Sequence, residues 1–444
     1  MKSKRIIALV LALVLTLGSV FSLSSCLSTL LYVLESSSPN GSGDSEQGQD
    51  SSNGGQGSGT GSSSSSDDEG EREAEFLPGS ENNGELIESV GASYKTLLST
   101  VVITSSFEVY SGSFNGYDYG DSTSVESSAG SGVIYSLDRE AGDAYIITNY
   151  HVVYNSDAIT QNRISSDISV YLYGQEYSTY AIPATYVGGS LTYDIAVLKI
   201  EDSEVIKNSL AVAATVADSD KVAVMDECFV VGNPEGDGMA VTTGTVSVDS
   251  ETLDMVGADG RTSISLRVMR VCAAVNHGNS GGGLYDSEGR LIGIVTAKKT
   301  GSDVDNIGYA IPINLAKNLV LNILSNCDGE DNTSIQRALL GITLTAYTTG
   351  LTVDAESGKI IKSELVEIVE LSDSCLMSDT LAVGDIITSI TLDGVTKEVT
   401  RTHHVIDVML AAGVGSVVTI TANRAGETVT ATVTIPESSI TTVK

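Results

Sequence analysis

The chain has 444 residues and a formal net charge of −33, with 57 acidic side chains against 24 lysines and arginines. This balance argues against nucleic acid as a partner, which needs a basic footprint, and against adhesion to anionic lipid by charge alone. Valine, isoleucine and threonine are abundant after residue 95, and glycine-containing turns are frequent. A mainly β body of two to three domains is therefore expected.

The first 25 residues are typical of an export signal, because a basic start precedes an apolar run over residues 6–17. Residues 23–26 then resemble a bacterial lipobox, which implies cleavage before Cys26 and a lipid on its sulfur. An uncleaved signal anchor is the alternative, since residues 27–34 are still fairly apolar. Both interpretations place the body outside the cytoplasm and tether it to a cell membrane.

Residues 26–84 are expected to form a linker. From residue 35 to about 82 the chain is almost entirely serine, glycine, acidic residues and amides. Such a segment buries too little apolar surface to offset the entropy lost on ordering, so it predicts a disordered acidic spacer.

The segment 85–327 is expected to form one domain built from two small antiparallel barrels, opened by a short helix within residues 85–100 and closed by a helix over 314–325. The first set of expected strands covers 101–104, 131–136, 144–148, 168–172, 184–187 and 195–200. Between the first two of these strands, residues 111–130 are expected to form a long exposed loop. The second set of expected strands covers 227–231, 241–248, 263–271, 283–285, 291–297 and 308–312.

A polar stretch after Cys327 reads as a linker to a third unit over residues 336–437. The hydrophobic pattern of this unit predicts a helix over 404–410 and four strands. Those strands cover 366–371, 386–392, 417–421 and 429–435.

Ser280 is the candidate nucleophile, because it stands in a tight turn walled by glycines over residues 278–283. A serine becomes nucleophilic when a base removes its proton and amides stabilise the oxyanion. The amides of Gly278 and Ser280 are the expected oxyanion donors. No side chain of the flanking glycines obstructs such a turn.

His151 is the candidate base, since it follows a hydrophobic strand and is the only histidine in the first barrel. His277 lies inside the turn itself, and His403 and His404 are expected at the surface of the third unit. Asp194 precedes a buried strand and is the candidate for holding the other ring nitrogen of His151. The chain order His, Asp, Ser is that of chymotrypsin-type proteases.

These residues resemble the HtrA (Deg-type) serine proteases, over roughly residues 92–437. Further motifs occur in the family's order, at residues 130–134, 231–234, 243–247 and 307–312. The resemblance implies two six-stranded barrels with the active site between them, a homotrimer, and unfolded or damaged exported proteins as substrates. It implies no metal and no organic cofactor.

The third unit resembles a PDZ domain, through Leu381, residues 384–387 and residues 393–394. The resemblance implies that a carboxylate loop made of Leu340, Gly341 and Ile342 binds peptide C-termini, with the peptide adding as a strand.

The chain departs from the family pattern near the nucleophile, with His277 and Gly283 where prolines are usual and Cys272 where aspartate is usual. Losing proline leaves the loop freer, which is compatible with an oxyanion hole that is collapsed at rest. By the same resemblance, the pocket for the residue before the cut is formed by Ala274, Ile307 and Tyr309. This pocket carries no acid, so cleavage after small or medium aliphatic residues is expected.

Two alternative functions are compatible with this sequence. One is a non-catalytic peptide-binding or chaperone-like module that keeps the protease fold, and the other is a surface lipoprotein in which the acidic tail is the functional part. Apart from Cys26, four cysteines in an exported protein permit disulfides, with three full pairings. Isolated and mostly buried thiols are expected instead, because the body is large enough to bury a core without disulfides. The spacing of the cysteines matches no metal motif. They are Cys228, Cys272, Cys327 and Cys375.

Overall fold

The computed structural model describes residues 87–88, 90–110, 123–176, 179–298, 307–327 and 335–443. The expected leader, the lipid site at Cys26 and the acidic linker lie outside these residues. Within the described part of the chain, no helix is both long enough and apolar enough to cross a membrane.

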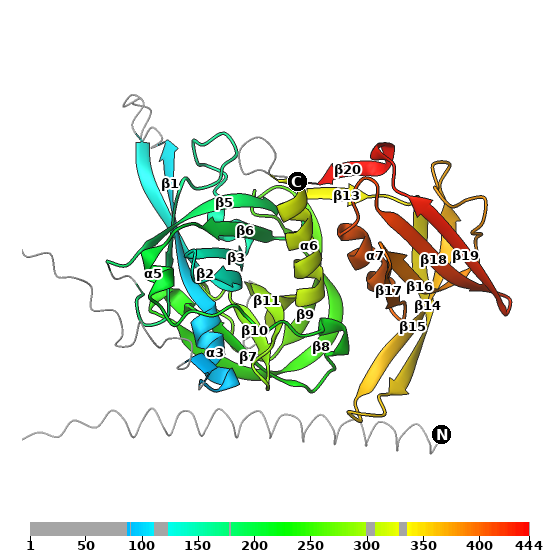
Figure 1. Ribbon diagram of the computed structural model, residues 1–444, viewed down its shortest axis with the longest axis horizontal. Helices are drawn as coiled ribbons and strands as arrows, with labels where there is room; N and C mark the ends of the chain where they lie inside the picture. The colour runs from blue at the N-terminus through cyan, green and yellow to red at the C-terminus, as the bar shows by residue number, and fades with distance from the viewer. Residues whose placement is uncertain are drawn as a thin grey trace, which may run out of the picture. The chain divides into compact units, whose positions relative to one another are not determined.

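The first barrel is closed and has the strand order β1-β2-β3-β6-β5-β4 (Figure 1). Its strands are β1 (Thr100–Tyr110), β2 (Thr123–Asp138), β3 (Asp143–Thr148), β4 (Asp167–Tyr171), β5 (Ile182–Ser190) and β6 (Ile195–Ile200). Most aliphatic side chains of β1, β3 and β6 are fully buried, among them Val101, Ile147 and Leu198. Burial of this kind stabilises the barrel by roughly 1.5–3 kcal/mol for each large aliphatic side chain.

The second barrel is also closed, with the order β10-β11-β12-β9-β8-β7. Its strands are β7 (Glu227–Gly232), β8 (Ala240–Val256), β9 (Ser263–Val271), β10 (Gly283–Asp286), β11 (Leu291–Lys298) and β12 (Gly308–Pro312). The expectation of two six-stranded barrels is therefore confirmed.

Short helices flank the first barrel in the chain, and one buried tyrosine bonds its start to the second barrel. Helix α3 (Ala92–Ser99) leads into β1, while α5 (Glu204–Lys207) and the 3-10 turn η1 (Ser219–Lys221) lie between the barrels in the chain. The fully buried Tyr285 of β10 has its hydroxyl 3.1 Å from Ser99 Oγ and 2.9 Å from Thr100 Oγ1. The start of the first barrel is thus bonded to the second.

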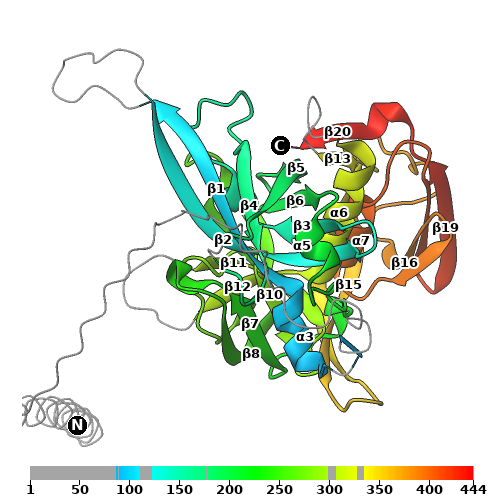
Figure 2. The ribbon, with the colours of Figure 1, turned by 60° about the vertical axis from the view of Figure 1, so that its left-hand side comes forward.

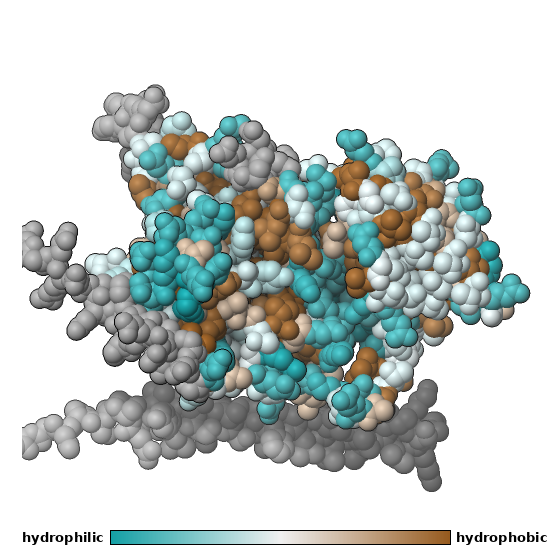
Figure 3. All heavy atoms as spheres, viewed as in Figure 1, coloured by the Kyte–Doolittle hydropathy of each residue, from teal (hydrophilic) through white to brown (hydrophobic). Residues whose placement is uncertain are grey.

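Helix α6 (Ile313–Asn326) follows the second barrel, close to the expected 314–325. Its buried side chains include Leu315, Leu319 and Ile323, which recur every four residues and so share one face. The opposite side exposes Leu321 and Leu324, and Figure 3 shows apolar surface where α6 lies in Figure 1.

The C-terminal unit is built around a sheet with the order β14-β15-β16-β18-β19, and β17 also pairs with β16. Its elements are β14 (Ile342–Val353), β15 (Ile360–Leu371), β16 (Ile386–Leu392), β17 (Val395–Glu398), α7 (Thr402–Leu410), β18 (Val417–Arg424), β19 (Glu427–Thr434) and the 3-10 turn η3 (Glu437–Ser439). A separate pair joins β13 (Ile335–Ala338) to β20 (Ile440–Val443).

Two features differ from the sequence-based expectation. Residues 123–130 belong to β2 rather than to a loop, and they extend the hairpin with β1 as far as Thr123 opposite Tyr110. Figure 2 shows this hairpin projecting from the first barrel. Strands β13, β14, β17 and β20 were not expected; most of β14 is exposed, so it lacks the buried alternation that marks a strand.

Candidate active site

A cavity of about 260 Å³ contains the three residues expected to act together, His151, Asp194 and Ser280. Residues of both barrels line it: His151 and Asp194 belong to the first, whereas Ile264 and Ser280 belong to the second. His151 and Ser280 are 129 positions apart in the chain, and the fold brings them to one site.

His151 lies on a single helical turn, α4 (Tyr150–Val153), directly after β3. Its Nδ1 is 3.0 Å from both carboxylate oxygens of Asp194, and its side chain is 38% exposed. Burial by itself lowers the pKa of His151, but the charge of Asp194 and its hydrogen bond raise it above the usual 6.5. The imidazolium form is thus stabilised by this carboxylate.

Asp194 lies in the turn between β5 and β6 with φ of 50°, an uncommon conformation for a residue other than glycine. The Asn149 side chain donates to its backbone carbonyl at 2.8 Å, and the amide of His151 donates to Oδ1 at 3.2 Å. The hydroxyl of Thr296 donates to Oδ2 at 2.6 Å. A backbone conformation of this kind costs about 1–3 kcal/mol. These donors stabilise Asp194 in it and orient the buried carboxylate.

Ser280 stands in a turn that requires glycine on either side. Gly278 and Gly281 have φ of 89° and 84°. A Cβ at these positions would lie 2.0 Å from the carbonyl oxygen of Asn233 and 2.1 Å from that of Ser131, respectively. Any side chain there would displace the nucleophile loop.

The hydroxyl of Ser280 donates to the backbone carbonyl of Thr296 at 2.8 Å. Within the described residues it has no hydrogen bond to His151. Thr296 therefore contacts two of the three residues, Ser280 through its carbonyl and Asp194 through its hydroxyl.

Ser131 of β2 anchors the nucleophile loop to the first barrel. Its amide donates to the Ser280 carbonyl at 2.8 Å, and its hydroxyl donates to the Gly278 carbonyl at 2.7 Å. The carbonyl of His277 accepts from the amide of Glu235 at 2.7 Å. Since a trans peptide points its N–H opposite to its C=O, the Gly278 amide faces away from Glu235.

The two expected oxyanion donors are the amides of Gly278 and Ser280. Neither has an acceptor among the residues that the structure describes. Unpaired N–H groups on one side of a nucleophile can receive a developing oxyanion.

The three residues expected to form the specificity pocket do not line this cavity. Ala274 is exposed and its carbonyl accepts from Thr242 Oγ1, while Tyr309 is buried in the main core and Ile307 packs against it. The apolar lining comes instead from β8 and β9, with Met255, Val256 and Ile264. Residues 299–306, next to Ile307, lie outside the described residues.

In the C-terminal unit, Leu340, Gly341 and Ile342 line a second cavity of about 470 Å³, together with Val405 and Met409 of α7. Gly341 has φ of 74°. The amides of Leu340 and Gly341 have no acceptor in the described part of the chain. The three residues of the expected carboxylate loop therefore line one cavity with apolar side chains of α7.

The remaining histidines and cysteines lie as follows. His277 and Cys272 are exposed, and Cys228, Cys272, Cys327 and Cys375 form no disulfide among the described residues. His403 and His404 were expected at the surface, but their side chains are only 14% and 6% exposed.

Sequence reasoning missed Thr296, Asn149 and the anchoring role of Ser131. Ser131 lies in the motif of residues 130–134, which forms part of β2, and Asn149 lies two residues before His151. Thr296 carries no local signal in the sequence. Its hydroxyl contacts Asp194, 102 positions away, and its carbonyl contacts Ser280, 16 positions away.

Comparison with known proteins identifies the family. The trypsin-like peptidase domain matches residues 130–294. The chain is 33% identical over 322 residues to the serine protease Do-like HtrA of Lactococcus lactis subsp. cremoris, covering 70% of this chain and 72% of that protein. This chain belongs to the HtrA family of serine proteases.

As an HtrA protein, the chain is a serine endopeptidase. It is also 33% identical over 268 residues to the periplasmic serine endoprotease DegP of Escherichia coli K12, covering 59% of this chain and 48% of that protein. Similar solved structures include the HtrA-type protease AlgW with a decapeptide, with 26% identity, a TM-score of 0.47, and coverage of 78% of this chain and 97% of the other.

Proposed function

We propose that Ser280, His151 and Asp194 perform the hydrolysis as a nucleophile, a base and an orienting carboxylate. The observation that carries this proposal is the 3.0 Å contact between His151 Nδ1 and Asp194 inside the cavity that also holds Ser280. This contact leaves Nε2 of His151 as the ring nitrogen that accepts a proton.

The reaction begins when the Ser280 hydroxyl leaves the Thr296 carbonyl and turns toward His151. Its oxygen then attacks the peptide carbonyl while His151 takes the proton, and the resulting oxyanion accepts from the amides of Gly278 and Ser280. His151 returns the proton to the leaving amine, which frees the first product and leaves an acyl-enzyme. Water activated by His151 releases the acyl group from Ser280.

The C-terminal unit, residues 336–437, acts as a PDZ domain in this proposal, following a protease domain over 85–327. The loop of Leu340, Gly341 and Ile342 offers backbone amides to a peptide carboxylate, and the groove beside α7 receives apolar side chains. Peptides that end in an apolar residue are the expected ligands, because Val405 and Met409 line the groove.

The substrates in this proposal are unfolded or damaged exported proteins, since unfolded chains present extended segments to a cavity between two barrels. Export is supported by the leader-like residues 1–25 and by the periplasmic relative. Attachment to the membrane through Cys26 and assembly as a homotrimer belong to the same proposal. Mass analysis of the N-terminal peptide from native membranes and light scattering of the purified chain test these two points.

The test of the catalytic assignment is active-site labelling of the purified chain with a fluorophosphonate, followed by peptide mapping. A single adduct on Ser280, lost in His151→Ala although Ser280 is still present, supports the assignment. Labelling at another serine, or equal labelling of His151→Ala, contradicts it. A chain that binds unfolded casein without cleaving it or reacting with the probe would be the non-catalytic module instead.

A further inference from the structure

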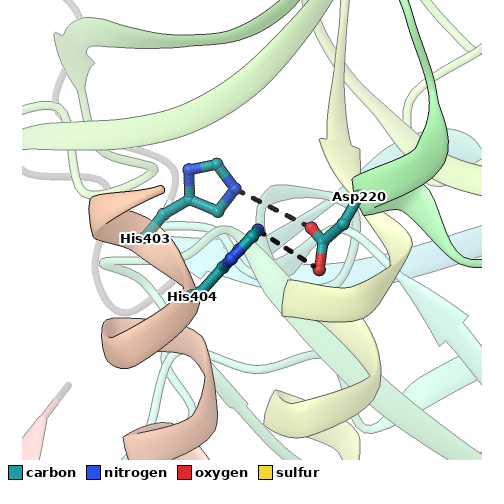
Figure 4. Close-up of side chains that lie close together, drawn as sticks. All are labelled: Asp220, His403 and His404. Carbon is teal, nitrogen blue, oxygen red and sulfur yellow. Dashed lines mark ion pairs between the residues drawn. The ribbon is translucent and has the colours of Figure 1, made fainter. Parts of the chain in front are cut away.

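Two histidines of the C-terminal unit and one aspartate of the protease barrels meet in a single cluster. Asp220 lies in η1 (Ser219–Lys221), in the segment between the barrels, and His403 and His404 lie in the first turn of α7. Figure 4 shows both imidazoles directed at the Asp220 carboxylate. One ligand atom of each residue lies within 4.8 Å of those of the other two.

The spacing within this cluster is too long for hydrogen bonds. His403 Nε2 is 3.7 Å from Oδ1 of Asp220, and His404 Nε2 is 3.6 Å from Oδ2. Two ligands of one tetrahedral zinc ion, each bonded at about 2.0–2.1 Å, are roughly 3.3–3.4 Å apart. Small side-chain rotations therefore bring these atoms to the separation that a shared zinc ion requires.

The environment of His404 favours a free Nε2 lone pair directed at Asp220. Its Nδ1 lies 3.1 Å from the carbonyl oxygen of Glu398 and 3.3 Å from the amide nitrogen of Thr400. These two neighbours favour opposite tautomers, and the closer one, the carbonyl, requires a proton on Nδ1. Metal-binding histidines commonly donate their second ring N–H to a carbonyl in this way.

Burial distinguishes the cluster from chance surface histidines. The side chains of Asp220, His403 and His404 are 10%, 14% and 6% exposed. A cavity of about 470 Å³ reaches Asp220 and His404 and supplies an entry path and room for a water ligand. Two imidazoles, one carboxylate and one water form a common coordination set for zinc.

The cations around the cluster are mostly neutralised by carboxylates of their own. Arg267 pairs with Asp407, and Arg401 pairs with Asp249 at 2.7 Å. Lys397 is the exception, because its ammonium lies 2.6 Å from Oδ2 of Asp220 and competes directly with any ion there. Its side chain is 33% exposed, so it can move into solvent when an ion binds.

We propose that Asp220, His403 and His404 form a zinc site that links the protease barrels to α7 of the C-terminal unit. Helix α7 also supplies Val405 and Met409 to the apolar groove. An ion at its first turn would therefore fix the helix that lines this groove. The site could not be predicted from the sequence, because Asp220 lies far in the chain from His403 and His404.

The test is a zinc titration by calorimetry of the full chain carrying Ser280→Ala, after chelation and dialysis. We expect one zinc ion per chain. Asp220→Asn and His403→Ala should each weaken binding at least tenfold, whereas His277→Ala, a matched exposed histidine, should leave it unchanged. Lys397→Met should tighten binding several-fold, because it removes the competing ammonium.

Cobalt absorption and circular dichroism complete the test. Cobalt bound by imidazole and carboxylate gives visible bands without the near-ultraviolet thiolate band that cysteine ligands produce. A thiolate band, binding that survives both Asp220→Asn and His403→Ala, or no binding by a chain with native circular dichroism would overturn the proposal. Unchanged or weaker affinity in Lys397→Met would overturn it too, even if the other variants fail to fold.

Discussion

Replacing Thr296 with valine removes one hydroxyl from the active site and keeps the shape of the side chain. That hydroxyl donates to Oδ2 of Asp194 at 2.6 Å, and the Asp194 side chain is 5% exposed, so water cannot replace the lost donor. Hydrogen bonds to charged groups contribute about 1.5–3 kcal/mol. If the whole of this is lost from the transition state, kcat/KM falls by about 10- to 150-fold.

The stability of the protease domain should fall as well. A loss of about 1.5–3 kcal/mol lowers Tm by roughly 3–12 °C in a domain of this size. Most of the kinetic loss should appear in kcat rather than KM, since Thr296 positions Asp194 through its side chain and keeps its backbone carbonyl. Thr296→Ser is the matched control, because it retains the hydroxyl.

The assay is steady-state cleavage of a quenched fluorescent peptide, with calorimetric scans of the same preparations. Thr296→Val with wild-type kcat and Tm would refute the argument that this donor supports the carboxylate. A loss shared equally by Thr296→Ser would show that the methyl group and its packing, rather than the hydroxyl, are responsible.

Four further outcomes are expected. Ala in place of Ser280, His151 or Asp194 should each lower kcat by about 10⁴-fold or more, with doubles far from additive, as measured by casein digestion. The kcat/KM profile should rise with pH through an inflection above 6.5, the usual pKa of histidine, because only neutral His151 takes the proton. Asp194 raises the pKa of His151, so Asp194→Asn should move the inflection to lower pH. The stability that this pair adds should be present at low pH and be lost as pH rises through the raised pKa of His151, as urea titrations across that range would show. Gly278→Ala should lower kcat by about 10²–10³-fold, since its Cβ would lie 2.0 Å from a carbonyl oxygen and displace an oxyanion donor; an active variant in a peptide assay would contradict this.

The barrels and the candidate catalytic residues could be predicted because their signals are local. A strand such as Ile195–Ile200 contains a run of four apolar residues, which can be read from the sequence. The glycines on either side of Ser280 can be read there too, and in the structure Gly278 and Gly281 have positive φ. The order of three motifs along the chain then pointed to the barrel pair that would bring them together.

What could not be predicted depends on contacts between distant segments. Strand β14 is largely exposed on a sheet, so its composition lacks buried alternation. His403 and His404 look like surface residues in the sequence, but in the fold they are buried and lie near Asp220 of η1, a distant segment. The specificity residues were taken by position from a resemblance and stay a prediction. The apolar lining of the cavity depends on where β8 and β9 place Met255 and Ile264, which no local pattern indicates.

The nucleophile loop lacks the prolines that are usual in its family, and hydrogen bonds restrain it instead. The carbonyls of residues 277, 278 and 280 accept, in turn, from the amide of Glu235, the hydroxyl of Ser131 and the amide of Ser131. Proline would restrict the backbone by covalent geometry in the folded and unfolded chain alike, whereas the two bonds from Ser131 exist only when both barrels are in place. Because Ser131 belongs to the first barrel and the loop to the second, the oxyanion donors depend on contact between the barrels. The same contact brings His151 to Ser280, so loosening it would remove the base and the oxyanion donors together.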